Sequence, residues 1–188
     1  MIETSVINEI IELIERGNFQ LICIDGIDGV GKSTLADKLS VSLGFSSINL
    51  DDYVEEEKGN FVDFLNLARL SAAINESKQA IIIEGICLLE VLSKIDRSPD
   101  LLIYIKRMSS YGSWRDEEEC EITEDIEEFI QKKKQDLKEF CIAEARIEGR
   151  EFNENEFSFP ALREEIFRYH YKHSPHKKAG VLFIRKSC

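Results

Sequence analysis

FQLICIDGIDGVGKST, residues 19–34, is the most informative stretch of the sequence. The apolar run from Phe19 to Ile24 ends at Asp25-Gly26 and predicts a buried strand. The residues that follow match the pattern GxxxxGK[ST] in full, and a helix is expected from about Lys32 to Leu43. Such a loop curls so that its N–H groups face one point, which predicts a phosphate-binding loop. Its members are Gly26, Ile27, Asp28, Gly29, Val30, Gly31, Lys32, Ser33 and Thr34.

Two side chains of this loop are expected to touch the phosphates and a metal ion. Lys32 would reach the β and γ phosphates of a nucleotide, and the Ser33 hydroxyl would ligate Mg²⁺. The positive end of the following helix adds about half an elementary charge at the same point. Asp28, inside the loop, either hydrogen-bonds the loop backbone or lies near the metal, and the first role is favoured.

Two carboxylates follow the next predicted strands. Asp51 lies in the run NLDDY after a short strand, and Glu84 lies in the run IEGI at the end of an apolar strand. In a doubly wound sheet the carboxyl ends of strands next to the phosphate loop face the terminal phosphate. A carboxylate there can take the proton of an attacking hydroxyl, which makes Asp51 a candidate base. Glu84 is expected to bind the acceptor or, like Asp51, to help Ser33 hold Mg²⁺. The alternative for Asp51 and Asp52 is a polar turn.

The order of the predicted elements indicates an α/β fold. Helices are expected over about 5–16, 32–43, 61–74 and 161–171 and after Thr123, and strands over 19–24, 47–50, 80–83, 101–105 and 180–184. Strands that alternate with helices predict a mostly parallel sheet, here of about five strands, with helices on both faces. This is the three-layer sandwich expected of a P-loop NTPase. No linker divides residues 1–188, so a single domain is expected.

The charge is unevenly distributed along the 188 residues, whose net charge is −12. Residues 115–157 hold 16 acidic and 7 basic side chains, and an acidic helical insert or lid is expected at about 107–158. Acidic surfaces repel phosphate backbones, which argues against nucleic acid as a partner. No apolar run approaches the roughly 20 residues that span a bilayer, and the five cysteines form no CxxC pair. We therefore expect no membrane association and a cytoplasmic location, and the oligomeric state stays open.

Three stretches together resemble the uridine kinase and phosphoribulokinase group of P-loop kinases, which includes nicotinamide riboside and pantothenate kinases. They are the P-loop with Asp at its third position, the strand end LDDY at 50–53, and IIEGI at 82–86. The last helix, the Tyr-then-Pro loop and the last strand over 163–184 are also similar to those of the group. The resemblance implies ATP and Mg²⁺ as cofactors, Asp51 as the catalytic base and a small hydroxylated acceptor.

The resemblance also bears on the acceptor, which would be nucleoside-, sugar- or vitamin-like. The group places acceptor contacts on the helix after the catalytic loop, where Phe61, Asp63 and Arg69 lie. Asp63 would bind a pair of hydroxyls, or else is an ordinary exposed helix residue. Pyrimidine nucleoside kinases carry an extra hairpin between the second and third core strands. The short span between Asp51 and Glu84 leaves little room for it, which argues against a uridine or cytidine acceptor.

A charge clamp on the transferring phosphoryl group is expected from arginines after the fourth strand. Arg107 and Arg115 are the first candidates, with Arg146 and Arg150 next if the long helix folds back over the site. Two other classes stay open: an ATP-binding regulatory protein with a degenerate lid, and a nucleoside monophosphate or toxin-type kinase. A GTP switch is disfavoured because the guanine-binding string NKxD does not occur.

Three histidines recur near the end of the chain, at positions 170, 173 and 176. Pro175 breaks the helix before the last of them, and no carboxylate completes a zinc-ligand set. We interpret them as a solvated basic helix end.

Overall fold

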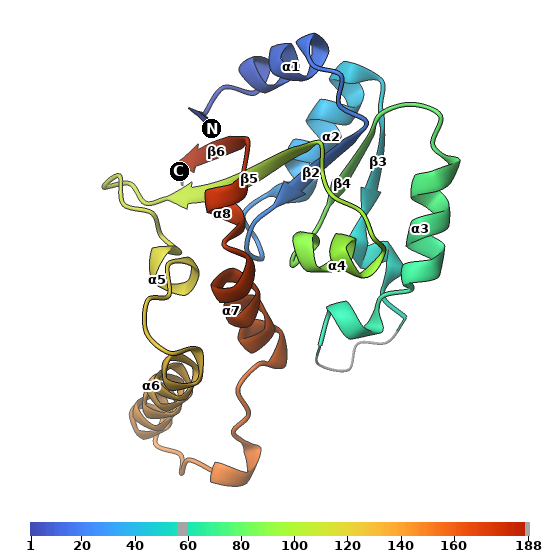
Figure 1. Cartoon of the computed structure of the whole chain (residues 1–188). Helices are drawn as coiled ribbons and strands as arrows, with labels where there is room; N and C mark the ends of the chain where they lie inside the picture. Colours follow the sequence, from blue (N-terminus) through green and yellow to red (C-terminus); the bar gives the residue numbers. More distant parts are fainter. Residues whose placement is uncertain (56–59, 187–188) are drawn as a thin grey trace.

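The computed structural model describes residues 1–55 and 60–186, and a parallel sheet forms its centre (Figure 1). The six strands of the described residues all run parallel, in the order β1-β6-β5-β2-β4-β3. The strand that precedes the P-loop, β2, lies between β5 and β4. The strands are β1 (Ile2–Thr4), β2 (Leu21–Asp25), β3 (Ser46–Asn49), β4 (Ile81–Glu84), β5 (Leu101–Met108) and β6 (Val181–Lys186).

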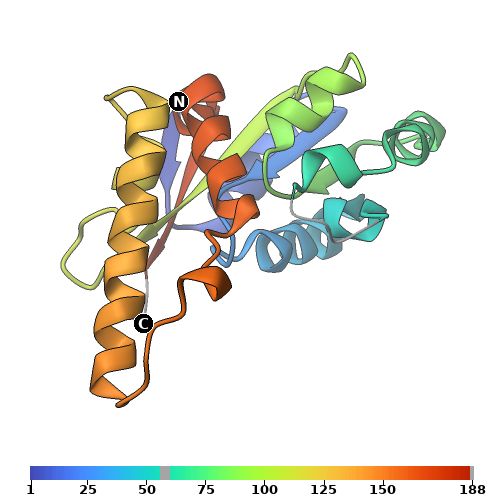
Figure 2. The same cartoon turned by 90° about the horizontal axis from the view of Figure 1, so that it is seen from below.

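Helices cover both faces of the sheet, as the sequence predicts. Figure 2 shows α4 and α7 on one face and α2 on the other, while α3 lies beside the edge formed by β3. This arrangement confirms the α/β three-layer sandwich. The α-helices of this body are α1 (Ile7–Arg16), α2 (Lys32–Leu43), α3 (Leu67–Glu76), α4 (Leu88–Lys94), α7 (Ala161–His173) and α8 (Pro175–Lys178), and the short 3₁₀ helices are η1 (Leu50–Tyr53) and η2 (Val62–Phe64).

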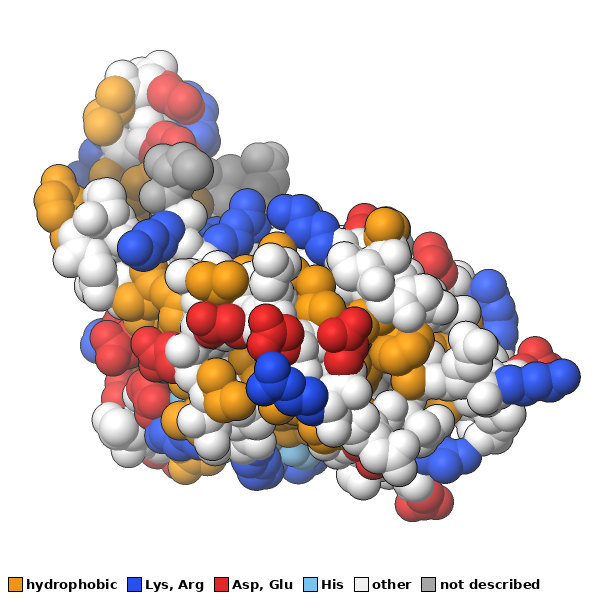
Figure 3. Space-filling model, turned by 90° about the horizontal axis from the view of Figure 1, so that it is seen from above, with side chains coloured by type: hydrophobic (Ala, Val, Ile, Leu, Met, Phe, Trp, Pro, Cys, Tyr) orange, Lys and Arg blue, Asp and Glu red, His pale blue; other side chains and the backbone are white. Residues whose placement is uncertain are grey.

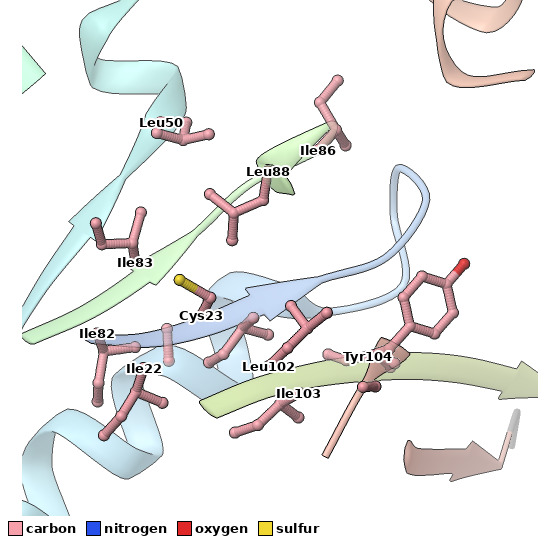
Figure 4. Close-up of a cluster of buried hydrophobic side chains, with 14 of the residues drawn as sticks. Ile22, Cys23, Leu50, Ile82, Ile83, Ile86, Leu88, Leu102, Ile103 and Tyr104 are labelled. Atoms are coloured by element: carbon pink, nitrogen blue, oxygen red, sulfur yellow. The ribbon is translucent and has the colours of Figure 1, made fainter. Parts of the chain in front are cut away.

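The core lies along the three central strands β2, β4 and β5. Ile22, Ile82 and Ile103 are fully buried, and Ile22 lies in register with Ile82 on one side and with Leu101 on the other. Figure 4 shows these side chains with Leu50, which enters the same apolar cluster from η1. Nearly continuous apolar strands are typical of a sheet that is buried on both faces. The core therefore fixes β2 at the centre of the sheet and places the P-loop at its carboxyl end.

The sheet has one strand more than the sequence predicts. The additional strand β1 pairs with the edge strand β6, where Ile2 lies in register with Val181. A three-residue strand is too short to show a periodicity of its own. Helix α4 is likewise missing from the sequence prediction. It follows Cys87, whose φ of +53° lies in the left-handed region, and no residue that normally begins a helix marks its start.

The prediction of a helix over 61–74 is wrong for its first residues, because the chain folds back on itself before α3 starts. Glu55 N donates to Phe64 O at 2.8 Å, and Asn66 N donates to Tyr53 O at 2.8 Å. These bonds flank an antiparallel bridge between Val54 and Leu65. Helix α3 then starts after Asn66, whose side chain caps it. The span between β3 and β4 thus contains a short antiparallel pairing, where the sequence predicts one helix.

The acidic insert is helical. It contains α5 (Glu117–Cys120), α6 (Ile126–Ile147) and the 3₁₀ helix η3 (Glu154–Glu156). Asp125 caps α6, with its Oδ1 accepting bonds from two backbone N–H groups at 2.9 and 3.2 Å. Phe129 and Ile130 of α6 pack on Phe167 of α7 in a small apolar cluster of their own. Figure 2 shows α6 alongside α7, and α5 also contacts α7, while Glu121 of the insert pairs with His176 and Lys177 of α8.

The interpretation of the histidines as a solvated helix end is wrong for two of the three. His170 and His176 are only 1% and 3% exposed. His170 Nδ1 donates to Ile166 O at 2.8 Å, so its Nε2 accepts the hydroxyl proton of Tyr104 of β5, also at 2.8 Å. Burial lowers the pKa of His170 to about 4. His170 is therefore a neutral core residue that joins α7 to the central sheet.

The surface carries charges of both signs. On the face in Figure 3, acidic, basic and apolar side chains are mixed, and no single kind covers it. Within the part of the chain that the structure describes, no helix combines the length and apolar character needed to span a membrane.

Candidate active site

The P-loop joins β2 to α2 and has a backbone that glycine adopts most readily. Gly29 and Gly31 have φ values of +70° and +94°, in the left-handed region. Gly31 is the N-cap residue that precedes α2, so the positive end of that helix points into the loop. Lys32 Nζ donates to Ile27 O at 2.9 Å, which folds the side chain back across the loop. The loop backbone, the helix end and Lys32 are thus shaped to surround an anion.

A cavity of about 450 Å³ opens beside the P-loop. It brings together the loop and both carboxylates that the sequence singles out. An apolar wall and one further arginine complete it. Its lining comprises Asp28, Gly29, Gly31, Lys32, Ser33, Thr34, Asp51, Phe61, Glu84, Gly85, Ile86, Leu162 and Arg185.

Carboxylates surround the Lys32 ammonium group. Lys32 is only 7% exposed, and burial lowers its pKa because the charged form loses hydration. The carboxylates that oppose this lowering of the pKa are those of Asp25, Glu84, Asp28 and Asp51, in order of effect. The cavity lining holds three acids, Asp28, Asp51 and Glu84, against two bases, Lys32 and Arg185, so an excess of negative charge opposes a phosphate that enters alone. A phosphate ligand would therefore enter most favourably together with a cation.

Ser33 and Glu84 form the pair that fits such a cation. Ser33 Oγ donates to Glu84 Oε1 at 2.8 Å, and Glu84 is 3% exposed. Burial raises the pKa of Glu84, while the bond from Ser33 and the charge of Lys32 oppose that rise. Within residues 1–55 and 60–186, no three His, Cys, Asp or Glu side chains group as a metal site. Mg²⁺ suits this arrangement nonetheless, because it takes one or two protein oxygens and completes its shell with water and phosphate.

Asp51 is held at the rim of the cavity by η1. Asn49 Oδ1 accepts the N–H of Asp51 at 2.9 Å and caps this short helix. A Cβ on Gly85 would lie 2.6 Å from Leu50 Cδ1, so the glycine lets η1 approach the end of β4 closely. The sequence reasoning assumes that the strand before Asp51 is adjacent to β2. In the structure that strand is β3, and β4 lies between β3 and β2. Asp51 still reaches the cavity because η1 follows β3 directly.

Asp25 is a buried acid of the site that sequence reasoning misses. It ends β2, is fully buried, and its Oδ1 accepts the N–H of Gly26 at 2.7 Å. Its other oxygen accepts the hydroxyl of Tyr169 of α7. The Tyr169 oxygen in turn accepts the N–H of Leu89 in α4, at 3.2 Å. Asp25 therefore ties the start of the P-loop to both helices on one face of the sheet.

We expect the contribution of Asp25 to the free energy of unfolding to increase as the pH falls. Burial raises its pKa to about 6, against 3.8 for the free group, so the folded state binds the proton more tightly than the unfolded state. This stabilisation is present below about pH 4 and is lost as the pH rises through about 6. Asp25→Asn removes it. Compared with the variant, the wild type should gain about 2 kcal/mol of unfolding free energy between pH 7 and pH 4.5. Urea unfolding at both pH values measures this difference, and equal pH dependence of the two proteins would show that the Asp25 pKa is not raised.

Of the predicted acceptor residues, Glu84 and Phe61 line the P-loop cavity, whereas Asp63 and the clamp arginines lie outside it. Asp63 is exposed, and its carboxylate contacts Lys94 Nζ at 3.2 Å beside a separate cavity of about 520 Å³. Arg107 Nη2 contacts Asp116 Oδ1 at 2.6 Å. Arg115 is an exposed residue that does not line the cavity. The remaining candidates, Arg146 and Arg150, lie at the far end of the insert and are also absent from the cavity lining.

The cavity contains residues that the sequence reasoning passes over. Leu162 faces the P-loop from α7, and Ile86 lies two positions after Glu84. Phe61, which the sequence already places among the acceptor contacts, lines the cavity beside them. Arg185, near the carboxyl end of β6, donates through Nη1 to Val30 O at 2.6 Å. The rule that carboxyl ends of parallel strands meet at one edge would have identified Arg185, since it follows the last predicted strand. No comparable signal marks Leu162, because only the path of α7 brings it to the loop.

Comparison with known proteins shows a likeness at the level of the fold. No protein-family model and no curated protein matches the sequence. Among solved structures, the chain is similar to a possible uridine kinase from Bacillus stearothermophilus. They share 16% identity over 94% of this chain and 96% of that one, with a TM-score of 0.50. A shikimate kinase from Bacteroides thetaiotaomicron has 15% identity over 88% and 86% of the two chains, with a TM-score of 0.41.

These identities are too low to transfer an activity, but the first match extends over nearly the whole of both chains. The two chains therefore share a fold, which in this chain is a six-stranded parallel sheet with the P-loop at the carboxyl end of the central strand β2. The chain therefore has the fold of the uridine kinase-like P-loop kinases.

Proposed function

We propose that this protein is an ATP- and Mg²⁺-dependent phosphotransferase that moves the γ-phosphoryl group to a hydroxyl of a small molecule. The observation that carries the proposal is that one cavity is lined by six residues of the P-loop, Lys32 among them, and by the carboxylates of Asp51 and Glu84. A P-loop alone supports nucleotide binding. A carboxylate beside it adds the base that transfer to a hydroxyl requires.

The P-loop and Lys32 would bind the triphosphate. The N–H groups of the loop and the start of α2 supply partial positive charge, and Lys32 supplies a full charge at the β and γ phosphates. Because Lys32 is buried, its attraction for the phosphates is screened less than it would be in water. Ser33 and Glu84 are the residues that would hold Mg²⁺. When bound, Mg²⁺ neutralises charge on the β and γ phosphate oxygens.

Asp51 would act on the acceptor. Its carboxylate orients the hydroxyl in line with the γ-phosphorus and takes the hydroxyl proton as the new oxygen–phosphorus bond forms. The bond between the γ-phosphorus and the bridging oxygen breaks in the same step, and ADP leaves with that oxygen. The products are ADP and a phosphate ester, and the proton rests on Asp51 until water removes it. Asp51 suits this role because it is exposed to the cavity and capped in place by Asn49.

The size and lining of the cavity favour a small acceptor. Its volume of about 450 Å³ must also hold the phosphate end of ATP. Phe61, Ile86 and Leu162 form an apolar wall, against which a ring or a carbon chain would pack. We therefore propose a nucleoside-, sugar- or vitamin-like alcohol as acceptor, and no nucleic acid.

An ATP-binding regulatory protein is the second candidate, favoured by the state of the arginines near the site. Arg107 is paired with Asp116, and Arg163 at the start of α7 is paired with Glu119. A guanidinium that already binds a carboxylate gives less stabilisation to a transferring phosphoryl group. A regulator would need ATP binding without such a clamp.

A screen of ATP consumption separates the two candidates. Nucleosides, sugars, vitamins and their phosphates would be added singly, and ADP formation measured with and without Mg²⁺. We expect one chemical class of alcohols to raise ADP formation above the background, and Asp51→Asn to abolish that rise. If ATP binds but no compound raises ADP formation, the regulatory function replaces the proposed one. If only phosphorylated acceptors respond, the protein is a nucleoside monophosphate or toxin-type kinase.

A further inference from the structure

Arg185 is the basic residue of the cavity to which neither the P-loop pattern nor the resemblance to kinases gives a role. It comes from β6, two strands away from β2, and its Nη1 donates to Val30 O at 2.6 Å. A Cβ built on Gly31 would collide with the same guanidinium. The side chain of Arg185 therefore lies directly over the P-loop, and the absence of a side chain at Gly31 is what allows this contact.

The charge of Arg185 is available, in contrast to that of its neighbour Arg107. The two residues lie in register on adjacent strands, which puts two positive charges side by side. Arg107 is neutralised by Asp116, whereas among residues 1–55 and 60–186 no carboxylate forms an ion pair with Arg185. Its contact is a neutral carbonyl, in a chain whose net charge is −12. A guanidinium has five N–H donors, so the bond to Val30 leaves others for a ligand.

The position of Arg185 indicates which part of a nucleotide it would meet. Asp51 and Glu84 reach the cavity from β3 and β4, on one side of β2, whereas Arg185 reaches it from β6 on the other side. In the proposed reaction the γ-phosphate faces Asp51. The phosphates that are not transferred would then lie toward Gly31 and Arg185, where the loop N–H groups hold them.

We propose that Arg185 binds the α and β phosphates of the nucleotide, as a fixed cation beside the P-loop. This inference rests on the proposed nucleotide binding of the cavity. A guanidinium binds a diphosphate through two parallel hydrogen bonds. Here the bond to Val30 O already orients the Arg185 guanidinium. Because ADP and ATP share these two phosphates, Arg185 holds substrate, transition state and product alike. Its loss therefore weakens binding and changes the turnover at saturation little.

Calorimetric titration of Arg185→Gln with ADP and with inorganic pyrophosphate, each with Mg²⁺, tests the assignment. We expect the Kd of both ligands to rise about 10- to 100-fold, as for loss of a charged bidentate contact. Arg185→Lys should recover part of the affinity, because it keeps the charge without the planar fork. Lys186→Gln is the matched control. It removes one positive charge at the next position of β6, where the side chain points to the opposite face, and should bind both ligands as the wild type does.

The outcomes distinguish this inference from the proposed function. Wild-type protein that binds neither ADP nor ATP overturns both. Normal wild-type binding with Arg185→Gln within twofold of it overturns the role of Arg185 alone. Weaker ADP binding with unchanged pyrophosphate binding assigns the contact to the nucleoside and also overturns the proposal. A loss of affinity shared equally by Lys186→Gln would mean that overall charge, and not the position of Arg185, is responsible.

Discussion

Lys32→Ala should remove tight binding of ATP, with a rise in Kd of about 100-fold or more and a fall in turnover of about 10³-fold. The reason is the electrostatic balance of the cavity. Lys32 is the ammonium group that the carboxylates of Asp25, Glu84, Asp28 and Asp51 surround. Without it, the incoming phosphates would meet those acids with only Mg²⁺ and Arg185 to offset them. Calorimetric titration with MgATP measures the Kd directly.

The matched control for this variant is Lys38→Ala. Lys38 lies on the same helix α2, is exposed, and is not among the residues of the cavity. Its loss changes the net charge of the protein equally, so the affinity for ATP should stay close to the wild-type value. Equal affinities of Lys32→Ala and wild type would mean that the nucleotide does not bind at the P-loop.

Asp51→Asn should keep ATP binding and lower turnover by about 10²- to 10⁴-fold. The asparagine keeps the shape and the cap from Asn49, but it cannot accept the proton of the acceptor hydroxyl. Because the bonds from the loop to the phosphates stay, the Kd for ATP should change only a few-fold. Steady-state kinetics with the best acceptor from the screen give the turnover, and the same titration gives the Kd.

Asp52→Asn serves as the control for Asp51→Asn. Asp52 is the next residue in η1 and is exposed, but it does not line the cavity. Its substitution should leave turnover near the wild-type value. If the two variants lose turnover equally, the effect lies in the folding of η1. If neither does, Asp51 is not the base.

The sequence predicts the parts of the site that depend on local chemistry. The P-loop follows a strand and precedes a helix in the structure as its pattern requires, and Ser33 meets Glu84 although 50 residues lie between them. The positions of the P-loop after β2 and of Glu84 at the end of β4 follow from one rule, that the carboxyl ends of parallel strands share an edge. Applied to the last strand as well, that rule would have included Arg185.

The parts that the sequence does not predict depend on long-range packing. Tyr169 reaches Asp25 from a position 144 residues away, and no pattern in either segment marks the pair. The histidines of α7 look like a solvated helix end, because periodicity does not show that Tyr104 would cover His170. Arg107 follows the strand predicted over 101–105, as a clamp would, but in the structure it lies within β5 and Asp116 is close enough in the chain to neutralise it.

The most direct test of the proposed phosphotransfer is to follow the γ-phosphate of ATP into a product. Wild-type protein, Lys32→Ala and Asp51→Asn would each be incubated with γ-³²P-ATP, Mg²⁺ and a filtered metabolite extract, and the labelled compounds separated. We predict that the wild type alone moves the label into an organic phosphate ester. Label that appears only as inorganic phosphate, or that stays on ATP while ATP binds tightly, would contradict the proposal that this cavity phosphorylates a small alcohol.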